Sequence, residues 1–338
     1  ISDLQYMNRA LELAVLGMGS VSPNPLVGCV IVYNNKIIGE GFHQKNGEKH
    51  AEVNAIESVR DHSLLRESTL YVTLEPCSHH GKTPPCSDLI IKKGIKKVVV
   101  AVEDPNPLVS GSGIRKLRDA GVQVELALGR DKALEVNKRF FMSMVNKRPY
   151  VILKWAQTAD RFLARKNYDS KWISDEYSRA IVHTWRAQED AIMVGKNTAK
   201  YDNPKLTVRG TAGKNPLRVV LDQKLELDRK LELFSDGLPT LCYNLNDSKV
   251  LSETEFIKVT GKSFIEGVLT DLGLRNIQSL IVEGGAQLLS SFIDKDLWDE
   301  ARVFTSPKFF GDGIKAPDIN IHYTEEPLKS DKMLTYRN

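Results

Sequence analysis

With 338 residues, 41% of them hydrophobic, the chain is longer than one average domain and apolar enough for ordinary cores, which predicts two domains. The formal net charge is only +4 and no block of like charges occurs, so charge indicates neither a nucleic-acid nor a membrane partner. The four cysteines are too few for a disulfide scaffold, and no apolar run approaches the roughly 18 residues of a membrane span, so we expect a cytoplasmic protein.

The first half of the chain alternates helices and strands. It opens with an amphipathic helix near 3–18, whose apolar residues have helical spacing rather than the unbroken run of a signal peptide. Strands are then predicted near 27–33, 36–42, 69–74, 97–102 and 122–127. Helices are predicted near 50–60, 86–93 and 112–120, with a last helical stretch at 133–145. This order predicts a sheet covered by helices on both faces.

A short polar stretch ending in a proline and a tyrosine, NKRPY, marks a domain boundary near residue 147. A new α/β series begins there, with a strand at 150–156 and a helix near 174–188. It continues with strands near 190–195, 217–222, 239–243 and 278–283 and a helix near 286–294. The fold class is therefore α/β, with one domain over 1–147 and a second over 148–338.

Two segments, HAEVNAIESV and LEPCSHHGKTPPC, concentrate reactive side chains. A catalytic zinc ion takes three thiolate or imidazole ligands and keeps a fourth position for water, and His50, Cys77 and Cys86 supply three such ligands. Two thiolates balance the charge of the dication. Glu52, on the same first helical turn as His50, is placed to move a proton from water to a leaving amine. Cys86 begins a helix behind two prolines, where the helix dipole favours a thiolate.

Two other interpretations of these residues stay open at this point. A structural zinc site would close with a fourth ligand such as His79 or His80, but it leaves Glu52 unexplained. The second is a set of buried polar residues without metal. The order H-x-E followed by P-C-x-x-C is the signature of zinc nucleobase deaminases. HAE and PC match it, but eight residues separate the two cysteines instead of two.

The insert PCSHHGKTPPC, with NPLVGCVIV, GFHQKNGEKHAE and EDPNPLVSGSG, closely resembles the bifunctional riboflavin biosynthesis deaminase/reductase family, in which the longer cysteine spacing is normal. RPYVILKWA, HTWRAQEDAIMVGKNTAKYDNPKLTVR, NPLRVVLD and IVEGGAQLLSSF extend the resemblance over nearly the whole chain. It implies a cytidine-deaminase-like α/β/α domain that hydrolyses the amine of diaminohydroxyphosphoribosylaminopyrimidine. A dihydrofolate-reductase-like α/β domain would then reduce the opened ribose to ribitol. The implied cofactors are one Zn²⁺ per subunit and NADPH.

By this resemblance, His50, Cys77 and Cys86 bind zinc and Glu52 is the proton shuttle. Around the pyrimidine and its ribose phosphate the resemblance places Asn24, His43, His79, Lys82, Asp104 and Asn106. These residue types suit the task, since a lysine offers a cation to phosphate while amides and carboxylates read ring edges or ribose hydroxyls. Taken singly, each would be interpreted as a turn or capping residue.

The reductase half carries weaker signals of its own. EGGAQLL follows an apolar strand and opens a helix, so its amides could receive a cofactor phosphate, although a plain tight turn explains it equally well. Lys154, Arg186 and Arg209 are cations suited to a sugar phosphate, though each alone would be a solvated surface charge. The resemblance places the sugar substrate against Ser170, Arg186, Leu206, Arg209 and Glu283. It places NADPH against Ala156, Trp172, Thr198, Asp202, Gly285, Ala286, Gln287, Leu288, Leu289, Ser290 and Ser291.

One departure from the family lies in the turn after the first reductase strand, which reads TADR at 158–161. Arg161 stands where the family usually has a glycine, a residue that permits close backbone approach or a positive φ. Outside all motifs, His62 and His322 are expected at the surface. Cys29 and Cys242 lie in strand-like runs and are expected to be small buried hydrophobes.

Three functions compete on this sequence. A two-step enzyme of flavin synthesis, acting on a small phosphoribosyl pyrimidine, is favoured. A nucleic-acid base deaminase with an accessory nucleotide-binding domain should show a basic stripe with interleaved aromatics, which a charge of +4 does not indicate. A nucleotide-binding regulatory module with structural zinc would release no ammonia. We expect a homo-oligomer, dimer or tetramer, with neither nucleic acid nor membrane as a partner.

Overall fold

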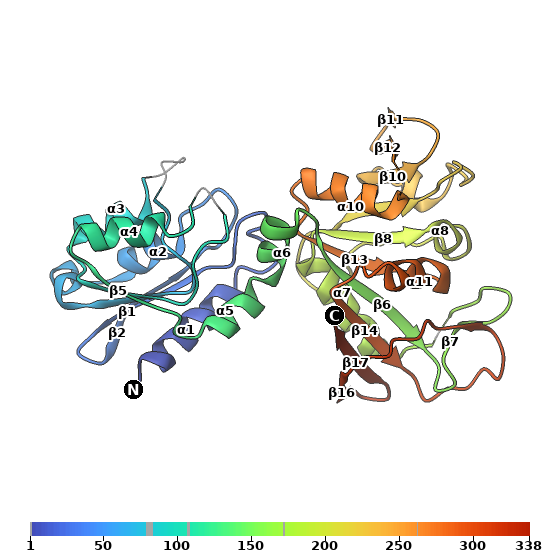
Figure 1. Cartoon of the computed structure of the whole chain (residues 1–338). Helices are drawn as coiled ribbons and strands as arrows, with labels where there is room; N and C mark the ends of the chain where they lie inside the picture. Colours follow the sequence, from blue (N-terminus) through green and yellow to red (C-terminus); the bar gives the residue numbers. More distant parts are fainter. Residues whose placement is uncertain (1, 79–83, 107–108, 172, 262) are drawn as a thin grey trace. The chain divides into compact units, whose positions relative to one another are not determined.

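The computed structural model describes residues 2–78, 84–106, 109–171, 173–261 and 263–338 (Figure 1). The chain divides into two compact units, Ile1–Lys147 and Arg148–Asn338, and each is described by itself below. Within the ranges just given, none of the helices combines the length and the apolar character that a membrane crossing requires.

A five-stranded sheet forms the centre of the first unit, in the order β2-β1-β3-β4-β5. β1 pairs antiparallel with β2 and β3, whereas β3, β4 and β5 run parallel. Each strand lies within a predicted strand range, and the bounds are β1 Gly28–Tyr33, β2 Lys36–Phe42, β3 Thr69–Val72, β4 Lys97–Val100 and β5 Gln123–Leu126. The carboxyl ends of the parallel strands β3 and β4 meet at one edge of the sheet, so the segments that follow them are neighbours.

Helices cover both faces of this sheet, as predicted (Figure 1). Because successive residues of a strand point to opposite faces, Cys29 and Ile31 of β1 pack in one core while Val30 and Val32 pack in the other. The first core includes side chains of α2, α3 and α4, and the second includes side chains of α1. The bounds are α1 Asp3–Val15, α2 Ala51–Ser58, α3 Cys86–Lys93 and α4 Ser112–Asp119, with a 3-10 helix at His62–Glu67.

The predicted single helix over 133–145 is wrong, because two helices, α5 Arg130–Val136 and α6 Lys138–Asn146, meet at Asn137. The buried side chain of Asn137 accepts a hydrogen bond from Leu26 N and donates one to Leu26 O, each at 2.8 Å. This contact between residues far apart in the sequence fixes the junction, and hydrophobic periodicity cannot reveal it.

The second unit contains a ten-stranded sheet in the order β11-β12-β10-β9-β8-β13-β6-β14-β17-β16. Its parallel part consists of β12 Thr254–Lys258, β10 Thr240–Asn244, β9 Leu217–Leu221, β8 Ala191–Gly195, β13 Ser279–Glu283, β6 Tyr150–Gln157 and β14 Glu300–Thr305. Antiparallel strands flank it at both edges, namely β11 Lys249–Leu251, β17 Lys332–Arg337 and β16 Tyr323–Pro327.

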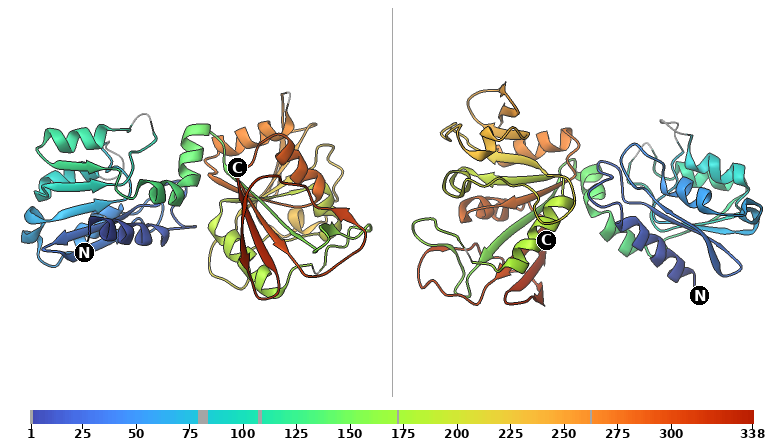
Figure 2. Two further views of the ribbon diagram at one scale, coloured as in Figure 1. Left: turned by 60° about the horizontal axis from the view of Figure 1, so that its bottom comes forward. Right: turned by 180° about the vertical axis from the view of Figure 1, so that it is seen from behind.

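Two cores lie on opposite faces of this sheet, and helices cover both (Figure 2). Met193 of β8 packs with residues of α10 and α11, while its neighbours Ile192 and Val194 pack with residues of α7, α8 and α9. The bounds are α7 Glu176–Gln188, α8 Lys196–Asp202, α9 Glu232–Ser235, α10 Phe264–Leu274 and α11 Ala286–Asp294. The alternation along one strand thus separates the two helical layers.

A short two-stranded sheet pairs β7 Phe162–Ala164 with β15 Ile314–Lys315. The turn that leads into β7 contains Arg161, whose φ is 65°. The arginine therefore adopts the left-handed conformation, for which the resemblance leads us to expect a glycine at this position. The guanidinium is anchored outside the turn, on Asp318 at 2.5 Å and on the carbonyl of Pro317 at 3.3 Å.

Candidate active sites

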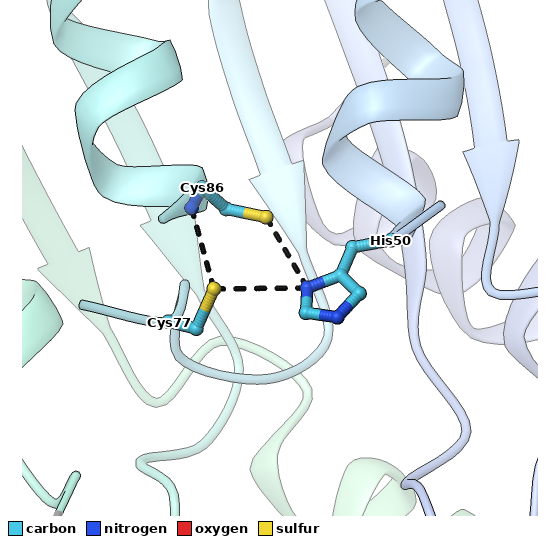
Figure 3. A group of neighbouring side chains, drawn as sticks. All are labelled: His50, Cys77 and Cys86. Atoms are coloured by element: carbon cyan, nitrogen blue, oxygen red, sulfur yellow. Dashed lines mark hydrogen bonds between the residues drawn. The ribbon is translucent and has the colours of Figure 1, made fainter. Parts of the chain in front are cut away.

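Three segments of the first unit bring a cluster of metal-ligating side chains together. His50 immediately precedes α2, Cys77 follows β3, and Cys86 is the first residue of α3. One ligand atom from each lies within 4.8 Å of the other two. Nδ1 of His50 lies 3.6 Å from Sγ of Cys77 and 3.4 Å from Sγ of Cys86 (Figure 3). The sequence predicted these three residues as one set.

The donor set fits zinc in both chemistry and spacing. Bond lengths of about 2.3 Å to sulfur and 2.0 Å to nitrogen put the sulfur and nitrogen ligands of a tetrahedral site about 3.5 Å apart. The two distances from His50 Nδ1 are close to this value. Within the described part of the chain, the cluster holds three such residues and no fourth. A zinc ion held by these three ligands alone would keep one tetrahedral position for water, as in a catalytic zinc site.

The two cysteines differ in the state of their thiols. The pKa of the Cys77 thiol is lowered, first because Cys86 donates a hydrogen bond to it and also because of the hydrogen bond and charge of His50. The backbone N–H of Cys86, at the start of α3, also donates to Cys77 Sγ at 3.3 Å. The pKa of Cys86 is raised in turn by its hydrogen bond to Cys77 and by burial. The surroundings of Cys77 thus favour the thiolate, the form that binds metal.

Glu52 lies in the first turn of α2 and is almost completely buried. Burial raises its pKa to about 7, and the negative charge of Cys77 adds to the shift. A carboxyl group whose pKa lies near neutrality can both accept and release a proton, which is what a general acid/base needs. A buried carboxyl group with these properties thus lies beside the ligand set, two residues from His50.

Asn24 and His43 lie beside this cluster. Nδ1 of His43 lies 3.0 Å from the carbonyl oxygen of Lys49, which can only accept, so this nitrogen carries the proton. Nε2 of His43 then accepts from Nδ2 of Asn24 at 3.0 Å. Burial lowers the pKa of His43, which favours this neutral form. The rings of His43 and His50 stand edge to face with centroids 5.6 Å apart.

Asp104 and Asn106 lie in the loop after β4, where the carboxylate of Asp104 accepts the backbone N–H of Asn106 at 2.8 Å. The N–H of Asp104 donates to the carboxylate of Glu75 at 3.1 Å, and Glu75 is two residues from Cys77. The loop is therefore tied to the segment that carries a metal ligand. The other two predicted substrate residues, His79 and Lys82, lie outside the described residues.

A cavity of about 860 Å³ in the second unit lies at the carboxyl ends of parallel strands, where open α/β sheets bind their ligands. The predicted residues that line it are Lys154, Ala156, Ser170, Arg186, Thr198, Asp202, Arg209, Glu283, Gly285, Ala286, Gln287, Leu288 and Ser291. Leu206 and Leu289 lie in the apolar cores instead, and Ser290 is not among the lining residues. Trp172 lies outside the described residues.

Charged side chains converge at one wall of this cavity. Glu283 accepts two hydrogen bonds from the guanidinium of Arg186, at 3.1 and 3.0 Å, and its Oε2 lies 3.7 Å from Nζ of Lys154. Burial alone would raise the pKa of Glu283, but Lys154 and Arg186 outweigh it and lower this pKa to about 2. Burial lowers the pKa of Lys154, and the negative charge of Glu283 offsets this shift only in part. The lysine is thus readier than usual to release a proton.

The turn that follows Glu283 also lines this cavity and leads into α11. Gly284 has a φ of 156°, and the N–H of Gly285, at the start of α11, donates to Oγ1 of Thr198 at 3.1 Å. A side chain at Gly284 would need this unusual φ and would lie 3.2 Å from Thr198 Oγ1. A turn of this kind before a helix offers backbone N–H groups to a phosphate.

Several lining residues were not singled out from the sequence, including His183, Lys196 and Lys224. Nδ1 of His183 accepts the backbone N–H of Arg209 at 3.2 Å, and burial with two nearby arginines lowers the pKa of this histidine. The sequence did contain one signal for His183. This residue stands three positions before Arg186 in a predicted helix, so both lie on the same helical face. The two lysines belong to different strand ends and gave no such signal.

Two family models match the chain. The model of the cytidine and deoxycytidylate deaminase zinc-binding region matches residues 1–102, and the model of the RibD C-terminal domain matches residues 149–321. The first match includes all three clustered ligands, and the second includes the residues that line the cavity.

Curated relatives match over nearly the full length. The riboflavin biosynthesis protein RibD of Aquifex aeolicus is 42% identical, with 98% of this chain and 94% of the relative covered. The RibD protein of Bacillus amyloliquefaciens is 44% identical, with 93% and 86% covered. Such identity over both halves is far above that of a shared fold alone.

Solved structures of the same kind of protein match this chain over almost its full length. The deaminase/reductase of Thermotoga maritima, described as a diaminohydroxyphosphoribosylaminopyrimidine deaminase and 5-amino-6-(5-phosphoribosylamino)uracil reductase, has a TM-score of 0.91 at 39% identity and covers 99% of this chain and 98% of its own. RibD of Acinetobacter baumannii has a TM-score of 0.88 at 33% identity, with 98% of each chain covered. The chain therefore belongs to the RibD family, the bifunctional deaminase/reductases of riboflavin biosynthesis.

Proposed function

We propose that the first unit removes the ring amine of 2,5-diamino-6-ribosylamino-4(3H)-pyrimidinone 5′-phosphate, and that the second unit then reduces the ribosyl group to ribityl with NADPH. The observation that carries the proposal is the cluster of His50, Cys77 and Cys86 with the buried carboxyl of Glu52 beside it. The description of the Thermotoga maritima relative names a deaminase and a reductase activity, which supports the same pair of reactions.

In the deaminase, His50, Cys77 and Cys86 would hold one zinc ion per subunit. Bound zinc would supply a Lewis acid that lowers the pKa of water. The carboxylate of Glu52 accepts the proton that water loses as its oxygen bonds to the ring carbon. Glu52 then gives this proton to the departing amine, which leaves as ammonia, so protons balance. Asn24 and His43 bind one side of the pyrimidine, while Asp104 and Asn106 bind its ribose.

In the reductase, Arg186 and Arg209 bind the anionic sugar substrate beside Glu283. Bound NADPH would supply the hydride that reduces the carbonyl of the opened ribose, and the oxygen of that carbonyl then needs one proton. Lys154 is suited to supply it, because burial lowers the pKa of its ammonium group. Glu283 stays ionised at neutral pH and holds Lys154 and Arg186 in place.

The preference for NADPH over NADH rests on two further cations of the cavity. Lys196 and Lys224 follow the carboxyl ends of β8 and β9, and both line the cavity. Lys196 also pairs with Glu226, whereas Lys224 is exposed. Two lysines at this end suit the extra phosphate of NADPH. Replacing Lys224 by alanine should then raise KM for NADPH by about ten- to a hundredfold and leave KM for NADH unchanged, since a charge-assisted contact is worth about 1.5–3 kcal/mol.

The direct test supplies the purified protein with the diaminopyrimidine ribotide and zinc. Ammonia release is followed first, and NADPH oxidation is followed once ammonia has appeared. We expect one equivalent of each per ribotide. Ammonia release without later NADPH oxidation would restrict the proposal to the first reaction, and no ammonia from a zinc-loaded protein would contradict it.

A further inference from the structure

Glu75 is a buried carboxylate that neither the metal cluster nor the cavity accounts for. It stands between β3 and Cys77, and its own N–H donates to Val102 O at 3.0 Å. Its two oxygens accept four backbone N–H groups. Oε2 accepts from Asp104 at 3.1 Å and from Gly111 at 2.9 Å, and Oε1 accepts from Gly113 at 2.8 Å and from Ile114 at 3.2 Å. One side chain thus organises both ends of the loop between β4 and α4.

At the far end of this loop, Glu75 acts as the cap of α4. The residue at the N-cap position is Gly111, which has no side chain to cap the helix. The first N–H groups of a helix have no partner within the helix, and the carboxylate of Glu75 satisfies those of Gly113 and Ile114. A negative charge there is also favoured by the helix dipole.

At the near end, Glu75 holds the residues proposed to bind the ribose. The N–H of Asp104 is tied to Glu75, and the carboxylate of Asp104 in turn accepts the N–H of Asn106. The position of Glu75 therefore determines where the side chains of Asp104 and Asn106 can reach. A carboxylate can accept four such bonds, whereas a glutamine amide has a single oxygen and would present an NH₂ group to N–H donors.

The segment that carries Glu75 is itself fixed against this loop. A Cβ atom on Gly113 would lie 1.9 Å from the carbonyl oxygen of Pro76, so only glycine permits the contact. The hydroxyls of Ser78 and Ser112 are 2.6 Å apart. Cys77 lies between these contacts, and its carbonyl accepts from the N–H and the hydroxyl of Ser87 at 3.1 and 3.0 Å. The metal ligand and the loop thus share one rigid support.

We propose that Glu75 is a positioning residue of the deaminase: it sets the distance between the metal cluster and the ribose-binding loop of Asp104 and Asn106. The substrate class is a pyrimidine that carries a phosphorylated ribose, whose ring must reach the cluster while its sugar is held by the loop. This inference rests on the proposed function of the first unit. Glu75 acts through Asp104 and Asn106 and touches no reacting atom.

The test compares Glu75→Gln with the parent enzyme in the full zinc-loaded chain. A misplaced binding loop weakens the hold on the ribose, so KM for the ribotide should rise by about tenfold or more while kcat falls by less than about threefold. Zinc content and NADPH oxidation with deaminated substrate should stay at parent values. Asp61→Ala is the matched control, because Asp61 also caps a helix of this unit, with Ser63 N at 3.0 Å, but holds no loop of the site.

A double-mutant cycle separates positioning from plain stability. If Glu75 acts through Asp104, then Asp104→Ala should raise KM much less in the Glu75→Gln background than in the parent. Multiplicative effects on KM, or a Glu75→Gln enzyme whose KM equals that of the parent, would overturn the inference. If the Glu75→Gln variant loses zinc, Glu75→Asp takes its place in the cycle. Loss of zinc in both variants would overturn the inference, because Glu75 would then serve only to stabilise the fold. A parent that releases no ammonia would instead refute the proposed function itself.

Discussion

Lys154 and Glu283 are direct cross-strand partners on the parallel strands β6 and β13, with Nζ and Oε2 3.7 Å apart. Arg186 reaches the same carboxylate from α7, so one buried acid serves two cations. Buried ion pairs are costly to form, and removing one partner leaves an uncompensated charge. A cluster of this kind at the wall of a cavity indicates a site that binds anions and moves protons, more than a device for stability.

The pKa of Glu283 predicts how the stability of the second unit depends on pH. The folded state lowers this pKa from 4.5 to about 2, so the carboxylate contributes stability above pH 4.5 and loses it as the pH falls towards 2. The shift corresponds to a free energy of unfolding on the order of 3 kcal/mol. Glu283→Gln should therefore be less stable than the parent at neutral pH, with the difference shrinking between pH 4.5 and 2. Urea unfolding at a series of pH values measures it.

Glu325→Gln serves as the control for this measurement, because Glu325 is exposed and pairs with Lys332 on the surface. Its stability should follow that of the parent at every pH. A difference between Glu283→Gln and the parent that stays constant down to pH 2 would show that Glu283 is not ionised in the folded protein.

Lys154→Met tests the proton donor of the reductase. The substitution keeps much of the side-chain volume but removes the ammonium group, and Arg186 still pairs with Glu283. A general acid contributes about a hundred- to ten-thousandfold. NADPH oxidation with deaminated substrate should fall by that range while ammonia release remains. Lys166→Met, at an exposed lysine paired with Asp312, should leave both activities unchanged. A Lys154→Met enzyme with more than a tenth of parent turnover would assign the proton to another group.

Much of the architecture could be predicted from the sequence, because its buried strands are short apolar runs. β1 Gly28–Tyr33 and β8 Ala191–Gly195, for example, are almost wholly buried and lie within the predicted ranges 27–33 and 190–195. The strand β16 has no such pattern, since it is exposed along its length, and it was not predicted. α10 was missed as well, and the junction at Asn137 depends on a contact with Leu26 that no local pattern contains.

The metal cluster was predictable because zinc restricts ligand types, so His50, Cys77 and Cys86 stand out against the rest of the chain. Glu75 did not stand out, because its partners are backbone N–H groups, which leave no trace in a sequence. His183 and Lys224 were missed because cavity walls combine residues from several strand ends and helices. Ligand chemistry can thus be predicted from residue types, whereas support and shape depend on the fold.

Removing a thiol from the cluster should release the metal. Cys77→Ser and Cys86→Ser each leave two of the three ligands, so we expect purified protein to lose most of its zinc and its ammonia release. Cys242→Ser is the control, because Cys242 is buried in the second unit in an apolar core. Zinc is measured by metal analysis of protein purified without added metal. Equal zinc in all four proteins, the parent included, would refute the ligand assignment.

Arg161 offers a test of backbone strain. Its φ of 65° costs a residue other than glycine about 1 kcal/mol, and its surface ion pair with Asp318 is worth little because both side chains are largely exposed. Arg161→Gly should therefore be more stable than Arg161→Ala by about 1 kcal/mol, since both lose the ion pair and only glycine relieves the strain. Thermal unfolding of the two variants gives the comparison. Equal stability would mean that the turn relaxes to another conformation when the arginine is lost.

The two activities should be separable by single substitutions, because each candidate site consists of residues from one unit. Glu52→Gln removes the proton carrier of the deaminase while leaving its three ligands, so it should keep zinc and lose about a hundred- to ten-thousandfold in ammonia release. The same variant should oxidise NADPH at the parent rate when it receives deaminated substrate. Asp202→Ala should show the converse, with normal ammonia release and impaired NADPH oxidation, since Asp202 lines the reductase cavity.

Asp202 also has a structural explanation, because it ends α8 and lies in a turn built on Asp, Asn and Pro. A residue that only shapes this turn would change the unfolding temperature and leave KM for NADPH unaltered, whereas a cofactor contact would raise this KM in a protein of parent stability. Measuring both quantities for Asp202→Ala distinguishes the two roles. The decisive result concerns Glu52→Gln: if the folded, zinc-loaded variant failed on deaminated substrate, the two sites would not be independent, and the assignment of one activity to each unit would be wrong.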